Sequence, residues 1–461
     1  MDRGAGDAAG GDKAGGEIGV DLDELNSLAV RTAEALKADD AVALSTRIAE
    51  SMVRFADNSA TVANRVDETE LTVYLAKAGR RAIASTSNLS PAAVRGFVKD
   101  LYASMRGLPE AEYAPLPDAG ARFSQSGGVD RKLEDAEEML PELAKAAIGS
   151  SLASGGERSA GAISAWKATV AILTTSGARG SDSRTAITLN IRSFGEGDAS
   201  GHGLSCSSTL RGFDPEEAGR RAGEGAKGMR HATEPEAGKY EVLLSPTVAS
   251  NLIETVAGAA SAFSVDAGTS CLAGKLGKEV AAPAFYLTDH GVIEGGFGGR
   301  AFDDEGSPTR ATKIIDGGVL RGYLHNLTTA KKWRSATTGN AGLIAPHPWN
   351  LEVGAGDSSY EEMVKEMKKG IVLTSNWYTR FNNYRTGEFS TVPRDGAYLV
   401  EDGKVVRPLK GMRAGDDQQR LLSSVRLLSK EREWVQWWEV DTPTLCPWIL
   451  VDGVSITRAY D

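Results

Sequence analysis

The stretch SPTVASNLIETVAGAASAF, residues 245–263, predicts a helix that carries one acidic residue, Glu254, among small and apolar side chains. Ser245 suits the N-cap, and Pro246 suits the first helical position because its missing N–H is not needed there. No histidine or lysine lies within one helical turn of Glu254. Its carboxylate either faces solvent or has a chemical purpose that this helix alone does not reveal.

The overall composition is that of a globular protein with two or three domains. The chain has 461 residues, of which 41% are hydrophobic and 25% charged, and its net charge is −10. This negative charge disfavours non-specific binding to nucleic acid or to anionic membranes. No run of about 18 apolar residues is present, so we expect no membrane span.

Cysteine usage and the N-terminus both favour a cytoplasmic location. The three cysteines, Cys206, Cys271 and Cys446, are widely spaced and form no CxxC pair, which is typical of reduced thiols. Residues 1–19 contain no apolar core of a secretory signal. They are rich in Gly, Ala and Asp, and we predict that they are disordered.

The first half predicts an α+β domain over residues 20–225. Apolar residues recur at helical spacing from 20 to 54, and alternating strands follow up to residue 88. Ser90 and Pro91 begin a second helix. A Pro/Gly/Ser-rich stretch at about 108–130 indicates an internal linker.

The second half, residues 238–461, predicts a larger and mostly antiparallel sheet or open barrel. Asp-Gly pairs accept the positive φ of tight turns, and they predict three hairpins, within residues 314–326, 398–408 and 448–458. The expected fold class is therefore α+β, with an N-terminal α/β domain followed by this β-rich domain.

The search for catalytic motifs yields one cluster of acids. Asp303, Asp304 and Glu305 are either paired carboxylates for acid–base chemistry or a solvated turn. The glycine-rich segment before them, residues 295–299, lies among strands and lacks the lysine and the helix of a phosphate loop. No two of the five histidines have the spacing of metal ligands: His202, His231, His290, His325 and His347.

The segment EWVQWWEV, residues 433–440, is unusually rich in tryptophan. In a strand, Trp434 and Trp438 would point to one face, and Val435 and Trp437 to the other. Aromatic residues on both faces indicate either a buried core strand or an interface with another domain or subunit.

Several segments of the second half together resemble the TldD/TldE (PmbA) family of cytosolic peptidase-complex subunits. The match rests on the order and spacing of GTSCLAGKLGKEVAAPAFYLTDHG (268–291), FDDEGSPTRATKIIDGGVLRGYLHNLTTAKKW (302–333), PWNLEVGAGDSSYEEMVKEMKKGIVLT (348–374), NYRTGEFSTVPRDGAYLVEDGKVVRPLKGM (383–412) and DTPTLCPWILVDGVSI (441–456).

In the TldD branch of this family, the helix before GTS carries an HExxxH motif. Its histidines bind zinc, its glutamate is the general base, and a distal cysteine completes the site. In this sequence the histidine positions correspond to Ile253 and Gly258, and the glutamate position to Glu254. Cys446 lies inside the last strand segment and not in the glycine-rich loop where that branch has its cysteine. The resemblance thus implies the metal-free TldE/PmbA branch, with no cofactor in this chain.

The resemblance also implies a function and a partner. The chain would be an inactive subunit that pairs with a zinc-bearing TldD-like protein, or with itself, around a chamber for unfolded or leader peptides. Two alternatives stay open: a homodimer that binds peptides or proteins without cleaving them, and a self-sufficient hydrolase that uses Glu254 and the acids at 303–305. The candidate peptide-binding residues are Thr338, Gly339, Asn340, Gly387, Phe389 and Ser390.

Overall fold

The computed structural model describes residues 20–117 and 121–458, so the predicted disordered segment 1–19 lies outside the described residues. The first half forms a seven-stranded sheet. Its elements are α1 (Leu22–Ala35), β1 (Asp40–Ala56), β2 (Ser59–Lys77), β3 (Arg80–Thr86), α2 (Pro91–Ser104), β4 (Arg122–Phe123), α3 (Leu140–Ala153), β5 (Arg158–Thr174), β6 (Arg179–Phe194), β7 (Ser200–Ser207) and α4 (Pro215–Gly228).

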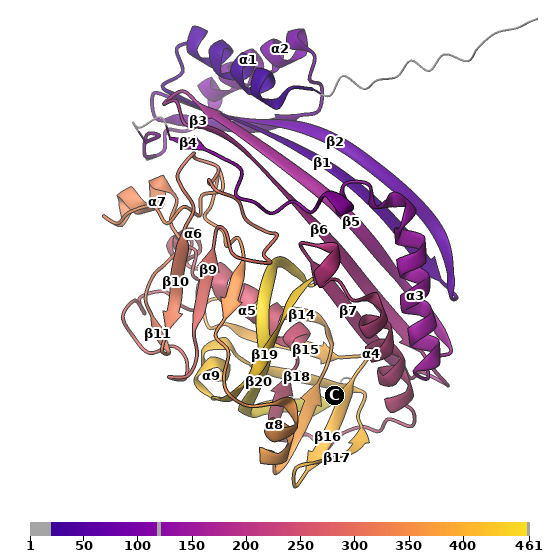
Figure 1. Ribbon diagram of the computed structural model, residues 1–461. Coiled ribbons are helices and arrows are strands. Elements are labelled where there is room, and N and C mark those ends of the chain that lie inside the picture. The colour runs from indigo at the N-terminus through magenta and orange to yellow at the C-terminus, as the bar shows by residue number, and fades with distance from the viewer. Residues whose placement is uncertain (1–19, 118–120, 459–461) are drawn as a thin grey trace, which may run out of the picture.

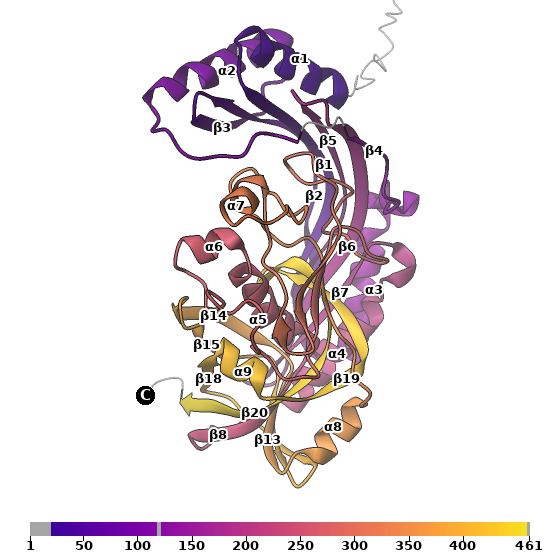
Figure 2. The same cartoon turned by 90° about the vertical axis from the view of Figure 1, so that its left-hand side faces the viewer.

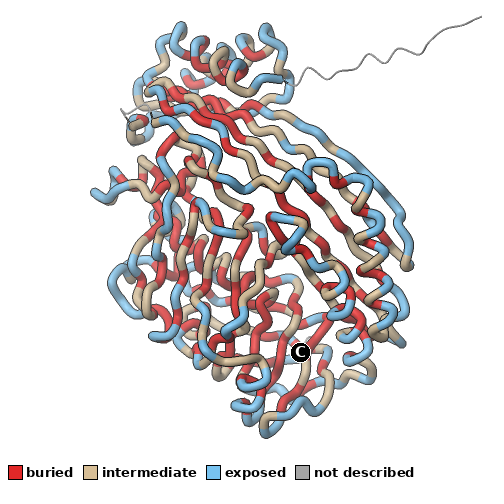
Figure 3. Tube along the Cα trace, in the orientation of Figure 1, coloured by how far each residue is buried: buried red, intermediate tan, exposed pale blue. Residues whose placement is uncertain are grey.

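The first sheet has α1, α2 and α3 on one face and the second half of the chain on the other (Figure 1), while α4 also contacts the second half through the Arg221–Glu433 ion pair. Its strand order is β3-β2-β1-β5-β6-β4, and β7 also pairs with β6. Alternate side chains of β1 point to opposite faces. Ala41 and Ala43 pack with α1 and α2, whereas Val42 and Leu44 pack with Phe302 of the second half. Both faces of the sheet are therefore buried where it meets these neighbours, as Figure 3 shows.

Helix α4 makes backbone contacts on two sides because its neighbours there are glycines or small residues. A Cβ on Gly219 would lie 2.1 Å from the carbonyl oxygen of Ala147 in α3. A Cβ on Gly203 of β7 would lie 1.9 Å from the carbonyl oxygen of Ala218 in α4. Only glycine permits these separations, so α4 is fixed between α3 and β7.

The second half forms a thirteen-stranded, open sheet. Its elements are β8 (Gly238–Leu244), α5 (Pro246–Ala259), α6 (Ala262–Asp266), β9 (Leu287–His290), β10 (Ala311–Asp316), β11 (Val319–Leu320), α7 (Leu327–Lys332), β12 (Leu351–Val353), α8 (Tyr360–Glu366), β13 (Lys369–Leu373), β14 (Asn376–Asn383), β15 (Glu388–Pro393), β16 (Ala397–Glu401), β17 (Lys404–Pro408), β18 (Met412–Asp417), α9 (Gln418–Ser423), β19 (Val425–Trp437) and β20 (Val440–Arg458).

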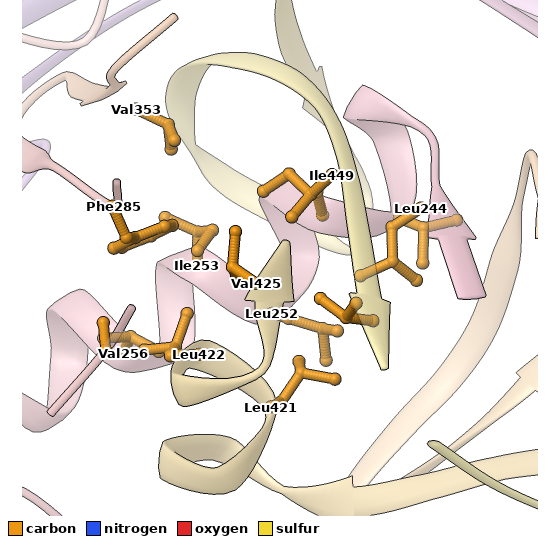
Figure 4. Close-up of a cluster of buried hydrophobic side chains, with 14 of the residues drawn as sticks. Leu244, Leu252, Ile253, Val256, Phe285, Val353, Leu421, Leu422, Val425 and Ile449 are labelled. Atoms are coloured by element: carbon orange, nitrogen blue, oxygen red, sulfur yellow. The ribbon is translucent and has the colours of Figure 1, made fainter. Parts of the chain in front are cut away.

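Most strand pairs of the second sheet are antiparallel, and the exceptions are β12–β20 and β8–β13. The predicted α+β class and the mostly antiparallel second half are thus confirmed. Helix α5 lies in the main core of this half (Figure 4), where Ile253 contributes to a cluster that includes Phe285, Leu421 and Ile449. No helix within residues 20–117 and 121–458 is long and apolar enough to cross a membrane.

The two halves lie against each other (Figure 2), and both buried polar contacts and apolar ones join them. Arg192 of β6 forms an ion pair with Asp395, which is fully buried, and Ser200 donates to the same carboxylate at 2.5 Å. The His202 ring lies 3.0 Å from the Ser375 hydroxyl oxygen. Because each of these groups loses water on burial, the bonds between them favour one arrangement of the two halves.

The predicted helix over residues 20–54 is wrong beyond Ala35. Helix α1 ends there, Lys37 adopts a left-handed φ of 60°, and β1 begins at Asp40. The Ala, Leu and Glu residues of β1 favour a helix when they are considered locally. However, β1 pairs with β2 on one side and β5 on the other, and these long-range pairs outweigh local propensity.

The hairpin predicted within residues 448–458 is also wrong, because β20 continues through it. Gly453 has a φ of 71°, and the pairing of β20 with β8 shifts register between Val451 and Val454. The Asp-Gly pair therefore makes a β-bulge, which uses the same backbone conformation as a tight turn. The other two hairpins are present as β10–β11 and β16–β17.

The contact between α4 and β7 can be tested with Gly203→Ala. The added methyl group forces the two elements apart, and we expect a loss of about 2–4 kcal/mol in the free energy of unfolding, measured with urea. The matched control is Gly149→Ala in α3, where a Cβ meets nothing within 4 Å. Alanine is the better helix former, so this control should gain about 0.5–1 kcal/mol. Equal stability of the two variants would contradict the close contact.

Candidate functional site

Helix α5 is the candidate site because it carries all three motif positions. Ser245 caps it by accepting a hydrogen bond from Val248 N, as the sequence predicts. Ile253 is 2% exposed and belongs to the apolar core. Gly258 borders a separate cavity of about 420 Å³, where a Cβ would meet nothing within 4 Å. The two positions therefore differ in surroundings as well as in residue type.

The residues at these positions do not fit a zinc ion. Isoleucine and glycine side chains offer no nitrogen, oxygen or sulfur ligand. Cys446 is fully buried, and burial raises the pKa of its thiol to about 12, which disfavours the thiolate that zinc requires. Among the residues that the structure describes, no group of three or more His, Cys, Asp or Glu side chains could hold a metal ion.

Glu254 is half-buried and binds backbone amides. Its carboxylate accepts hydrogen bonds from Thr442 N at 2.5 Å and from Asp441 N at 3.2 Å. Burial raises the pKa of Glu254 above its usual value, while the Thr442 and Asp441 amides act in the opposite direction by stabilising the carboxylate. The acid therefore holds the first residues of β20, directly after the turn that joins β19 to β20.

The turn itself is held by α5 as well. Asn251 donates from Nδ2 to the carbonyl oxygen of Glu439 at 2.6 Å. The Glu439 carboxylate in turn accepts from Tyr378 N at 2.8 Å. Sequence reasoning missed Asn251 and Glu439 because 188 residues separate them and neither lies in a recognisable motif.

This turn positions the tryptophan-rich segment between the two sheets. β19 ends at Trp437, which pairs with Val440 across the turn, so the predicted strand alternation does not extend to Trp438. Trp434 lies 5.9 Å from Phe297, between ring centroids, in a cluster that also contains Cys206 of the first sheet. Trp437 is buried, whereas Trp438 is 49% exposed. The segment is thus an interface within the chain.

A groove of about 470 Å³ lies between this turn and the inner face of the first sheet. Its floor is formed by β1, β5 and β6, and its other wall by the turn. The residues that line it are Ile48, Glu50, Ser164, Trp166, Ala168, Arg184, Thr188, Gln436, Trp437, Trp438, Val440 and Asp441.

The acidic segment 303–305 is engaged in structural bonds. Asp303 is fully buried and accepts from the backbone amides of Ser307, Glu305 and Ala341, and burial raises its pKa to about 7. Asp304 forms an ion pair with Arg300.

Glu305 completes this segment and accepts from Leu327 N at 2.8 Å. Burial, together with the charge of Asp303, raises the pKa of Glu305 to about 8. These bonds hold the segment that places Phe302 against the first sheet, so the three acids are not a solvated turn.

The six candidate peptide-binding residues fall into two groups. Asn340 donates to Asp289 at 2.6 Å, and Gly339 accepts from the Trp349 indole, so the segment 338–340 stabilises its own loop. In the other group, Phe389 is 3% exposed and Ser390 pairs with Gly415 of β18. Within residues 20–117 and 121–458, no hydrogen bond or ion pair joins the two groups. Their role in peptide binding stays a prediction.

Comparisons with known proteins agree on one family. Residues 237–458 match the PmbA/TldA metallopeptidase C-terminal domain, and residues 128–230 match the PmbA/TldA metallopeptidase central domain. The chain is 30% identical over 260 residues to a metalloprotease of Methanothermobacter thermautotrophicus, covering 53% of the chain and 56% of that protein. It is 31% identical over 172 residues to the metalloprotease PmbA of Escherichia coli O157:H7, covering 37% and 36%.

A solved structure shares the fold. TldE from Thermococcus kodakarensis superimposes with a TM-score of 0.84 at 19% identity, covering 94% of this chain and all of that one. The sequence alignments are shorter than this superposition. In them the chain spans about half the length, or less, of the curated relatives it matches.

The amide-binding role of Glu254 can be tested by hydrogen exchange. Glu254→Ala removes both acceptors, so the amides of Asp441 and Thr442 should exchange faster and the free energy of unfolding should fall by about 1–3 kcal/mol. Glu254→Gln keeps one acceptor oxygen and should lie between the alanine variant and the parent. The exposed Glu431→Ala is the control. Unchanged exchange at Asp441 and Thr442 in Glu254→Ala would rule out this role.

The raised pKa of Glu305 predicts a pH-dependent stability. Between its ordinary pKa of 4.5 and the folded value of about 8, the folded protein keeps a proton that the unfolded chain releases. The stability of the parent therefore falls as the pH rises, by at most about 1.4 kcal/mol per pH unit from this group. Glu305→Gln does not ionise and keeps an acceptor for Leu327 N. Its stability relative to the parent should rise from pH 5 to pH 8.

Urea unfolding at pH 5, 6.5 and 8 measures this difference, and the exposed Glu361→Gln is the control. A difference between Glu305→Gln and the parent that does not change with pH would contradict the burial of an ionisable group at this position.

Proposed function

Because the chain belongs to the PmbA/TldD metallopeptidase family, we propose that it is the non-metal-binding, TldE/PmbA-like subunit of a cytosolic peptidase complex. In this proposal a TldD-like partner supplies the zinc ion and the general base. The complex acts on unfolded or leader peptides, and this chain contributes binding surface and not catalytic groups.

The observation that carries the proposal is the state of helix α5. A zinc peptidase of the TldD type needs metal ligands at the positions of residues 253 and 258 of this chain. It also needs a glutamate that is free to take a proton from the metal-bound water. Here Ile253 belongs to the core, and the carboxylate of Glu254 is engaged with the amides of Asp441 and Thr442. The helix keeps its place in the fold but has a structural role.

The peptide-binding part of the proposal is supported by the groove beneath the β19–β20 turn. The groove presents the indole of Trp166 and the exposed Trp438 beside polar side chains, and such a mixed surface can bind the side chains of a flexible peptide. The alternative of a self-sufficient hydrolase is disfavoured because Asp303, Glu305 and Glu254 all accept backbone hydrogen bonds. The three free, buried cysteines support a reducing compartment.

The test is reconstitution with a TldD-like protein encoded in the same genome. We expect the lone chain to carry no stoichiometric zinc and to leave an unstructured peptide intact, whereas the mixture cleaves it and elutes as a complex in size-exclusion chromatography. Glu254→Gln in this chain should leave cleavage by the mixture within about twofold, because its carboxylate does not act on substrate. The matched control replaces the glutamate of the partner's HExxxH motif by glutamine and should abolish cleavage.

Three outcomes would contradict the proposal. Stoichiometric zinc in the lone chain would overturn its metal-free status. Cleavage by the lone chain that survives a chelator but is lost in Glu254→Gln would favour the self-sufficient hydrolase. A lone chain that forms a homodimer, binds the peptide and ignores the TldD-like protein would favour the binding protein without catalysis.

A further inference from the structure

Arg184 of β6 is a half-buried cation that forms no ion pair with another residue that the structure describes. Its Nε is buried and makes no hydrogen bond. The guanidinium lies 5.9 Å from the ring centroid of Trp166. Burial lowers the pKa of Arg184 to about 10, and the charge of Arg300 adds to this effect. A guanidinium that is partly withdrawn from water and has no counter-ion is unfavourable, so an anionic ligand in contact with it would be stabilising.

The acids near Arg184 do not compensate it by direct contact. Asp182, two residues earlier on the same face of β6, accepts from the backbone amides of Ser126, Ser183 and Ala301. Its charge favours the Arg184 cation but makes no bond to it. Asp304 is paired with Arg300.

Arg184 lies where two cavities meet. It lines the groove of about 470 Å³ under the β19–β20 turn and a second cavity of about 390 Å³ beneath the glycine-rich loop that follows β9. The second cavity is bordered by Ser126, Gly127, Gly128, Ser208, Thr209 and Glu294, among others. The amides of Gly127 and Gly128 donate no hydrogen bond to another described residue. Ser126, Ser208 and Thr209 add hydroxyl groups to this cavity, and Glu294 is the only acid among the residues that line it.

The pairing register of β1, β5 and β6 shows how the residues on the floor of the groove are arranged. Arg184 pairs with Ala168, which pairs with Ile48, and the next row is Ala186, Trp166 and Glu50. The cation is therefore at the β6 side, and Glu50 is two strands away on β1 at the opposite side. With about 4.8 Å between strands, roughly 10 Å separates these two strands.

The charges of the groove select the kind of anion. Glu50 and Asp441 both line it, so a polyanion such as a polyphosphate would be repelled. A single carboxylate suits the planar guanidinium, which can donate two parallel hydrogen bonds to it. The indoles of Trp166 and Trp438 offer apolar surface to the residues next to that carboxylate.

We propose that Arg184 binds a carboxylate of an extended peptide, either its C-terminus or an acidic side chain, while the neighbouring residues lie against Trp166 and Trp438. This proposal rests on the proposed peptide-binding function and specifies the class of peptide. It also gives the bound peptide an orientation, in which its carboxylate lies at the β6 side of the groove.

The experiment measures binding of three fluorescein-labelled decapeptides to the full chain by fluorescence polarisation. All consist of glycine, serine, leucine and valine; the first ends in a free carboxylate, the second is its C-terminal amide, and the third is an amide with one internal aspartate. We expect at least one of the carboxylate-bearing peptides to bind about tenfold more tightly than the simple amide. The peptide that gains affinity identifies the source of the carboxylate.

Arg184→Gln should remove this preference and bring all peptides to the affinity of the amide. Arg184→Lys keeps the charge but cannot donate two parallel bonds, so it should keep only part of the preference. The control is Arg54→Gln, an exposed arginine of β1 outside the groove, which should behave like the parent.

Thermal unfolding gives a second readout that does not depend on any peptide. If Arg184 lacks a counter-ion in the free protein, Arg184→Met should raise the Tm by about 2–5 °C. An arginine with a structural role would lower it.

The outcomes separate this proposal from the proposed function. Equal affinity of the parent for all three peptides would overturn the role of Arg184 and leave peptide binding in place. A lower Tm in Arg184→Met, or a carboxylate preference that persists in Arg184→Gln, would also overturn it. Absence of binding by every peptide, to the chain alone and to its complex with the TldD-like protein, would overturn both proposals.

Discussion

Strand β20 is the element on which the second half of the protein depends. It pairs with β8, β12, β18 and β19, and it can do so because the bulge at Asp452 and Gly453 changes its register part of the way along. Helix α5 packs on the same strand, with Ile253 and Ile449 in one apolar cluster. The position of the candidate site therefore follows from a single long strand and one glycine conformation.

The helix and the turn at this site form one structural unit. Asn251 binds the backbone of the β19–β20 turn through its carboxamide, and Glu254 binds the first amides of β20 through its carboxylate. Backbone amides need hydrogen-bond partners to the extent that packing withdraws them from water, and the half-buried Glu254 supplies two acceptor oxygens here. Glu254 therefore has a structural use in this chain that needs no metal.

Local signals in the sequence predicted the elements that local chemistry controls. The caps at Ser90 and Ser245, the hairpins at 316–319 and 401–404 and the α+β class all depend on residues close together in the chain. The errors occur where distant pairing decides: β1 was expected to be helical, and the Asp452–Gly453 pair was expected to turn. The environment of Glu254 depends on a contact with Thr442, 188 residues away, and that of Arg184 depends on the lack of a counter-ion. No local pattern in the sequence indicates either.

The pairing of β1 with β5 also constrains how the chain folds. Residues 42–55 of β1 pair with residues 161–174, so one edge of β1 has no strand partner until more than a hundred further residues have been synthesised. Contacts of such high sequence separation slow folding, and an open edge on a long strand invites pairing with other chains in the meantime. The nascent first half therefore passes through a stage at which β1 has an open edge and needs protection from aggregation, well before the helix of the candidate site has been made.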